Sequence, residues 1–141
     1  MKQFLHSFTI GVKDLDKMKK FYRDTFGWTP LKDTGNIAFF KLNGLILTLY
    51  PEDDFAAYIT IQQDGQGFKR FALAVNLNSE QAVDKTFAEL EKNGANVVKK
   101  PKKVFWGGYS GFVADIEDNY WEIGYNPFLE LDKKGNVISH K

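Results

Sequence analysis

The stretch Asp115–Pro127, DIEDNYWEIGYNP, has the pattern of a tight turn followed by a strand. Turn-forming residues come first, and bulky apolar side chains then alternate with others, which is typical of a strand with one buried face. Glu122 stands in the middle of this strand. Carboxylates are seldom buried without a partner or a function. The surroundings of Glu122 are therefore the first question that this sequence raises.

This stretch closes the second half of the chain. That half begins with a predicted strand over 70–75, RFALAV. A helix is predicted over 78–94, with Ser79 as its N-cap and an apolar face that repeats at helical spacing. A hairpin over 108–124 follows, with Asp118-Asn119 in its turn, where Asn119 tolerates a left-handed backbone.

The first half has the same order of elements. A strand is predicted over 7–12, SFTIGV, and an amphipathic helix over 13–27. A hairpin over 37–50 is predicted from Asn43-Gly44, a strong short hairpin signal. The two halves can therefore be superimposed as two βαβββ-like modules, with an extra loop, KKPKKVFWGG, in the second.

We therefore predict an α+β fold in which two βαβββ modules form a curved mixed sheet around a ligand cleft, with the helices on the outer face. The expected boundaries divide a single domain of 141 residues. They are module 1 at about 4–50, a linker with one strand (AYITIQ, 57–62) at 51–67, module 2 at about 68–127 and a tail at 128–141.

Strand alternation sorts the side chains into a bulky face, expected to pack on the helices, and a small, polar face, expected to line an open cavity. Pseudo-symmetry then brings four positions to the cleft: Ser7, Leu47, Arg70 and Glu122. Tyr120 shares the face of Glu122. The turn DKKGN near the C-terminus lacks the acidic spacing of a calcium loop.

Composition narrows the class of protein. The apolar fraction is 43% and the formal net charge is +1, as in ordinary soluble domains. The lysine-rich pieces are explained by solvated faces, so we predict no nucleic-acid partner. The chain lacks cysteine, an apolar run of membrane-span length and a signal-peptide pattern. A cytoplasmic protein without a membrane partner is the expectation.

Three segments of the chain resemble those of the glyoxalase, bleomycin-resistance and extradiol-dioxygenase superfamily, also called vicinal oxygen chelate proteins. They are VKDLDKMKKFYRDTFGW, FAELEKNGANVVKKP and WGGYSGFVADIEDNYWEIGYNP. The resemblance covers nearly the whole chain. It implies the two-module fold, a cavity for a small molecule and a homodimer, in which the cleft can be shared between chains.

The resemblance also implies where a metal would be held, because metal-dependent members place His and acidic ligands at the four cleft positions. Here only Glu122 matches. Leu47 cannot ligate a metal, and Arg70 would repel one. We therefore predict no metal and no other cofactor.

Six residues are candidates for the site: Ser7, Arg70, Trp106, Tyr109, Tyr120 and Glu122. Arg70 and Glu122 either form a salt bridge in the cleft, or Arg70 binds a ligand oxygen while Glu122 orients it or acts as a general base. Trp106 and Tyr109 either form an aromatic wall over the ligand or anchor their loop. Tyr120 and Ser7 either hydrogen-bond to the ligand or only line the wall.

Three functions are consistent with these residues, and the simplest of them is a structural or subunit-interaction module. The other two involve a small molecule. The first is a bleomycin-resistance-like protein that binds a small molecule in an aromatic cleft without the usual metal set. The alternative is a glyoxalase-like lyase or isomerase, or a dioxygenase-type enzyme, that acts through Glu122 or an unconventional metal site. The sequence alone does not decide whether the protein is an enzyme.

Overall fold

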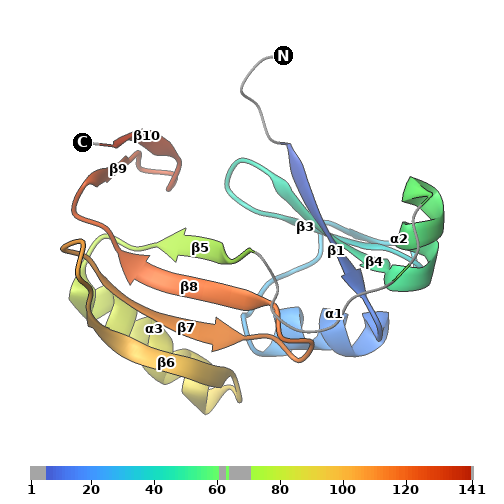
Figure 1. Ribbon diagram of the computed structural model, residues 1–141, viewed down its shortest axis with the longest axis horizontal. Helices are drawn as coiled ribbons and strands as arrows, with labels where there is room; N and C mark the ends of the chain where they lie inside the picture. Colours follow the sequence, from blue (N-terminus) through green and yellow to red (C-terminus); the bar gives the residue numbers. More distant parts are fainter. Residues whose placement is uncertain (1–5, 61–62, 64–70, 141) are drawn as a thin grey trace. The chain divides into compact units, whose positions relative to one another are not determined.

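The same strand order occurs twice along the chain. In the first half the sheet order is β1-β4-β3-β2, and in the second half it is β5-β8-β7-β6. The first half contains β1 (Ser7–Val12), α1 (Leu15–Asp24), β2 (Lys32–Asp33), β3 (Ala38–Lys41) and β4 (Ile46–Pro51) (Figure 1). The second contains β5 (Leu73–Asn76), α3 (Glu80–Lys92), β6 (Asn96–Lys103), β7 (Tyr109–Ala114) and β8 (Tyr120–Tyr125). The predicted α+β class with two βαβββ modules is confirmed.

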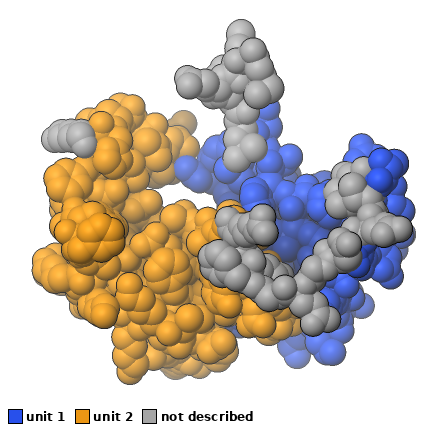
Figure 2. Space-filling view, viewed as in Figure 1, with its two compact units in different colours: residues 1–68 blue, residues 69–141 orange. Residues whose placement is uncertain are grey.

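The computed structural model describes residues 6–60, 63 and 71–140. The chain folds as two compact units, unit 1, Met1–Phe68, and unit 2, Lys69–Lys141 (Figure 2). In each four-stranded sheet the first strand runs parallel to the fourth, β1 to β4 and β5 to β8, whereas the remaining pairs are antiparallel.

Each module has one helix over the bulky face of its sheet. Helix α1 begins at the predicted position because the Asp14 side chain accepts a hydrogen bond from the Lys17 N–H at 3.0 Å. Its buried side chains are Met18, Phe21 and Tyr22. Tyr22 also stacks on Trp28, with ring centroids 5.6 Å apart. Aromatic packing therefore accounts for much of the unit 1 core.

Helix α3 is capped as predicted by Ser79, whose Oγ accepts from the Ala82 N–H at 3.1 Å. It buries Val83, Phe87 and Leu90. The buried residues of the adjacent strands include Val113, Trp121 and Ile123. Val113 pairs with Trp121 in the register of β7 and β8, so these side chains share the helix-facing side of the sheet.

The assignment of Leu47 to a cleft position was wrong. Leu47 is fully buried and lies opposite Phe8 in the parallel pair of β1 and β4, so it shares the helix-facing side. The cause is turn length. Residues 42–45 connect β3 to β4, but residues 115–119 connect β7 to β8, and one extra residue reverses the alternation.

The segment after β4 forms helix α2 (Glu52–Ile59), with Thr60 as its C-cap, so the predicted strand over 57–62 was wrong for 57–60; residues 61 and 62 lie outside the described part of the chain. Three acidic residues in the first turn favour a helix here, because carboxylates stabilise a helix N-terminus. A Cβ placed on Gly11 would lie 3.3 Å from the Phe55 ring. Helix α2 therefore covers part of the small-residue face that was expected to be open.

The C-terminal segment, predicted as a tail, is a hairpin of β9 (Leu129–Leu131) and β10 (Val137–His140). The predicted turn DKKGN connects them, and Asp132 accepts hydrogen bonds from the main-chain N–H groups of Lys134 and Asn136. Before this hairpin, the Phe128 ring lies 3.4 Å from where a Cβ on Gly107 would be. No helix among the described residues is both long and apolar enough to span a membrane.

Candidate functional site

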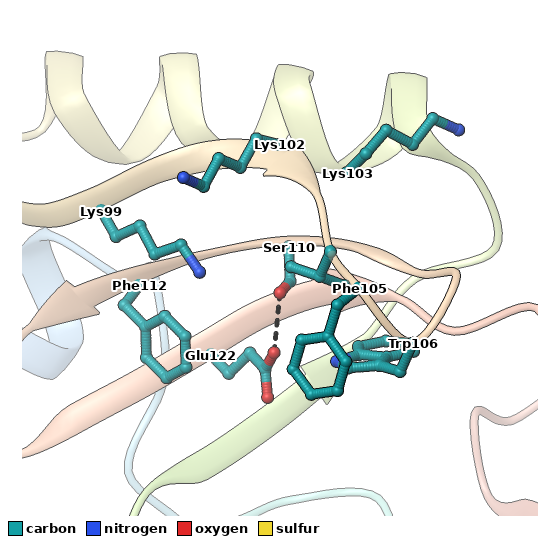
Figure 3. Close-up of a pocket in the computed structure, with 9 residues that line it drawn as sticks. Lys99, Lys102, Lys103, Phe105, Trp106, Ser110, Phe112 and Glu122 are labelled. Atoms are coloured by element: carbon teal, nitrogen blue, oxygen red, sulfur yellow. Dashed lines mark hydrogen bonds between the residues drawn. The ribbon is translucent and has the colours of Figure 1, made fainter.

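An open pocket of about 430 Å³ lies on unit 2, over the face of β7 and β8 opposite α3 (Figure 3). This volume falls within the range of small-molecule sites, about 300–1,000 Å³. Its lining combines lysines, aromatic residues, a serine and a carboxylate. The residues are Lys99, Lys102, Lys103, Val104, Phe105, Trp106, Ser110, Phe112 and Glu122.

Glu122 faces this pocket because of the register of β7 and β8. Phe112 lies opposite Glu122, and Ser110 lies opposite Gly124, so Ser110, Phe112 and Glu122 share one face. Ser110 is buried and donates a hydrogen bond from Oγ to Glu122 Oε1 at 2.7 Å. The carboxylate is therefore held in place by a neutral donor, and within residues 6–60, 63 and 71–140 no ion pair joins it to a basic side chain (Figure 3).

Lys99 and Lys102 reach the same face through irregularities in β6. The pairing with β7 shifts between Val97 and Lys99 and again between Lys99 and Lys102, so that Lys99 lies opposite Phe112 and Lys102 opposite Ser110. Each shift adds one residue to β6, as in a β-bulge. Pro101 lies within the second shift, where a residue without an N–H is tolerated. Regular pairing would instead bring Val98 and Lys100 to these two positions.

Gly111 makes room for the irregular part of β6. A Cβ at this position would lie 2.5 Å from the Lys99 carbonyl oxygen and 2.8 Å from the Pro101 nitrogen. The Phe87 ring, from α3, would be 2.6 Å away. The placement of the two pocket lysines therefore depends on a residue without a side chain at position 111.

The three lysines differ in their partners. Lys103 forms an ion pair with Glu80 at the start of α3, and its side chain points away from Glu122 (Figure 3). The Lys99 ammonium lies 5.7 Å from the centroid of the Phe112 ring, a cation–π distance. Within the described residues, neither Lys99 nor Lys102 forms an ion pair. The pocket therefore holds more positive than negative charge.

The aromatic part of the pocket comes from the connection between β6 and β7. Two main-chain hydrogen bonds close it, from Val104 N–H to the Gly108 carbonyl and from Gly107 N–H to the Val104 carbonyl, each at 3.0 Å. The Trp106 ring packs so closely on Gly108 that a Cβ there would lie 2.0 Å from ring carbons. Trp106 and the fully exposed Phe105 form one aromatic side of the pocket.

Of the predicted site residues, Glu122 and Trp106 lie in this pocket. Tyr120 is on the face of Glu122 but does not line the pocket. Ser7 is exposed on β1 of unit 1. Arg70 lies outside the described residues, so the predicted pairing of Arg70 with Glu122 stays a prediction.

Tyr109 was wrongly placed beside Trp106 in an aromatic wall. It is on the helix-facing side of β7, where its hydroxyl donates to Asp84 Oδ1 of α3 at 2.7 Å. This hydrogen bond to a carboxylate, together with desolvation, raises the pKa of Tyr109 above its usual value. Tyr109 therefore links β7 to α3.

Seven of the nine lining residues were missed in the sequence: Lys99, Lys102, Lys103, Val104, Phe105, Ser110 and Phe112. The lysines were assigned to a solvated loop, whereas β6 continues through Lys103. Pro101 between paired lysines could have indicated the bulge, because proline within a strand is confined to edges and bulges. Phe112 could have been found from the alternation that leads from Ser110.

The turn before β8 also differs in detail from the prediction. Asp118, and not Asn119, has the left-handed backbone, with a φ of 59°. Asn119 is buried, and its side-chain amide donates to Asp115 Oδ2 at 2.8 Å. Asp115 Oδ1 accepts from the main-chain N–H groups of Glu117 and Asn119, each at 2.9 Å. This network sets the start of β8 and thus the register of Glu122.

The side chains that line this pocket do not provide the ligands that a divalent metal needs. Such a metal needs about three ligands from His, carboxylate or thiolate groups. Among residues 6–60, 63 and 71–140, no three His, Cys, Asp or Glu side chains lie close enough together to hold one. Around Glu122 the polar neighbours are a serine and lysines, and ammonium groups repel a cation.

The model of the Glyoxalase/Bleomycin resistance protein/Dioxygenase superfamily matches residues 4–123. The chain belongs to this superfamily, and the resemblance found in the sequence is confirmed. The hairpin of β9 and β10 lies beyond the matched residues.

Solved structures of similar fold include other proteins described as glyoxalase-related. A glyoxalase-related enzyme from Fulvimarina pelagi is 26% identical, with a TM-score of 0.89 over 99% of this chain and 100% of that chain. A lactoylglutathione lyase from Agrobacterium tumefaciens is 22% identical, with a TM-score of 0.69 over 89% of this chain and 95% of that chain. A glyoxalase/bleomycin resistance protein/dioxygenase family enzyme from Burkholderia phytofirmans PsJN is 20% identical, with a TM-score of 0.74 over 84% of this chain and 95% of that chain. The last two show the fold alone.

Proposed function

We propose that this protein binds a small molecule in the unit 2 pocket, and that binding does not need the divalent metal set. One observation carries the proposal. A single pocket of about 430 Å³ is lined by three aromatic side chains, one anchored carboxylate, Glu122, and two lysines that form no ion pair within the described part of the chain. Apolar walls with a few placed polar groups are typical of small-molecule sites.

The aromatic residues supply most of the contact surface. Phe105 and Trp106 come from one end of the pocket and Phe112 from β7 (Figure 3). Planar side chains of this kind bind planar apolar groups at a low cost in side-chain entropy. The polar groups then orient the ligand, as Glu122 and the lysines lie on the same face as Phe112.

The test is calorimetric titration of the purified protein with small aromatic carboxylates, before and after treatment with a metal chelator. Trp106→Ala should weaken binding by about tenfold or more, since one aromatic contact contributes on the order of 1–3 kcal/mol. Tyr109→Phe is the matched control, because Tyr109 faces α3 and its loss should leave affinity unchanged. An affinity that is the same in Trp106→Ala as in the unmodified protein would refute the proposal.

Two results would favour the enzymatic alternative instead. The first is turnover of a bound compound that is lost in Glu122→Gln, because this change removes the basic group and keeps the shape. The second is a stoichiometric metal that Glu122 holds, detected by elemental analysis of the purified protein. A homodimer and a cytoplasmic location belong to the same proposal, and sedimentation of the protein and fractionation of cells test them.

A further inference from the structure

We propose that the pocket selects aromatic acids that carry a hydrogen-bond donor, a hydroxyl or an amino group, beside the acid group. The acid group would lie at Lys99 and Lys102, and the donor at Glu122. This inference rests on the proposed function, because it assigns the ligand class of the same pocket.

The position for the acid group follows from the two lysines. They occupy successive pocket-facing positions of β6, opposite Phe112 and Ser110. Like charges at neighbouring positions repel each other, which an anion between them would relieve. Lys103 differs from these two lysines, because it already forms an ion pair with Glu80.

The contact of Lys99 with Phe112 directs the ammonium without neutralising it. The ammonium lies 5.7 Å from the ring centroid, and Figure 3 shows it on the side of the pocket where Ser110 and Glu122 lie. A cation–π contact leaves the formal charge in place. Lys99 can therefore still bind a carboxylate or a phosphate of a ligand.

The position for the donor follows from Glu122. Its Oε1 accepts from Ser110, and no ion pair joins it to a lysine within the described residues. A carboxylate has acceptor sites on both oxygens, so Oε2 can accept a further hydrogen bond. A ligand that is only an anion would meet repulsion from Glu122. A ligand that also offers a hydroxyl or ammonium hydrogen would satisfy it.

Three phenyl compounds separate these contributions in calorimetric titrations. Phenyllactate carries both the carboxylate and the hydroxyl, phenylpropanoate lacks the hydroxyl, and methyl phenyllactate lacks the charge. We expect phenyllactate to bind about tenfold more tightly than either of the others, since a hydrogen bond to a charged group contributes on the order of 1.5–3 kcal/mol. Phenylalanine tests the amino form of the donor.

Charge variants then assign the positions. Lys99→Met and Lys102→Met should each weaken phenyllactate by about fivefold to tenfold and leave methyl phenyllactate unchanged. Lys100→Met is the matched control, because Lys100 is on the same strand but does not line the pocket. Glu122→Gln should reduce the preference for phenyllactate over phenylpropanoate. In the unmodified protein, affinity for phenyllactate should fall as salt is raised.

The outcomes separate this inference from the proposed function. Suppose that the compounds bind in a Trp106-dependent way, but the lysine variants bind phenyllactate as tightly as Lys100→Met does, or the hydroxyl group does not change the affinity. The proposed ligand class is then wrong, whereas the proposed binding of a small molecule in this pocket is still supported. If no aromatic compound binds in a Trp106-dependent way, both are overturned. The salt dependence needs no variant, so it tests the charge contribution even if a substitution impairs folding.

Discussion

The turn that sets the register of Glu122 should depend strongly on the Asn119 side chain. Asn119 and Asp115 are 1% and 2% exposed, and the amide of Asn119 donates to Asp115 Oδ2 at 2.8 Å. Asn119→Ala removes this donor and leaves one oxygen of a buried carboxylate without it. Losing a hydrogen bond to a charged group costs on the order of 1.5–3 kcal/mol, so we expect the free energy of unfolding to fall by about 2 kcal/mol.

The chain contains a matched control for this variant. Asp132 and Asn136 form the same set of hydrogen bonds in the turn between β9 and β10, with the Asn136 amide 3.0 Å from Asp132 Oδ2. That turn is only half-buried. Water can replace the lost donor there, so Asn136→Ala should cost much less than Asn119→Ala.

The measurement is urea unfolding followed by tryptophan fluorescence, to which the buried Trp121 contributes. With a denaturant slope of roughly 1–3 kcal/mol per molar urea, the midpoint for Asn119→Ala should fall by on the order of 1 M. Equal losses for Asn119→Ala and Asn136→Ala would refute the argument that burial makes the first turn more sensitive. No loss in either variant would show that the amide hydrogen bonds add nothing.

Three further predictions concern the surroundings of the pocket. Gly111→Ala should destabilise the protein by about 2 kcal/mol or more and weaken anion binding, because a Cβ there would lie 2.5 Å from the Lys99 carbonyl oxygen; urea unfolding and titration with phenyllactate check both effects. Gly108→Ala should displace the Trp106 ring, which near-ultraviolet circular dichroism would detect, and reduce aromatic binding to the level of Trp106→Ala. Tyr109 should ionise above its usual pKa of 10.0, and Asp84→Asn should lower that pKa in an absorbance titration. Since the folded state holds this proton more tightly than the unfolded state, the contribution of Tyr109 to stability should be present below about pH 10 and lost as pH rises through the raised pKa.

Much of the fold could be predicted because local signals agreed with one another. Strand β1, both capped helices and the hairpin at Asn43-Gly44 combine the expected hydrophobic period with a cap or turn residue. Helix α2 was missed because AYITIQ has the alternation of a strand. The acidic residues Glu52, Asp53 and Asp54 were the competing signal, and they begin a helix that reaches Ile59.

The pocket was harder to predict because its polar residues depend on register. Glu122 was assigned correctly to the face opposite α3, since β8 alternates regularly from Tyr120 onward. The same reasoning failed for Leu47, where a turn of different length reverses the alternation. It could not place Lys99 and Lys102, because bulges break the alternation along β6.

The sequence also contains a signal for the C-terminal hairpin, in the spacing of an aspartate and an asparagine. Asp132 and Asn136 have the same spacing as Asp115 and Asn119, and both pairs form the same hydrogen bonds. Since the earlier turn was already predicted to join two strands, the later one could have been assigned in the same way.

The irregularity of β6 also bears on how this protein avoids aggregation. Strand β6 is at one edge of the unit 2 sheet. An exposed edge invites the strand of another molecule, and natural proteins discourage this with bulges, proline and lysine. Strand β6 has two bulges, Pro101 and four lysines within eight residues. The features that place Lys99 and Lys102 in the pocket thus also make this edge a poor template for intermolecular β-pairing.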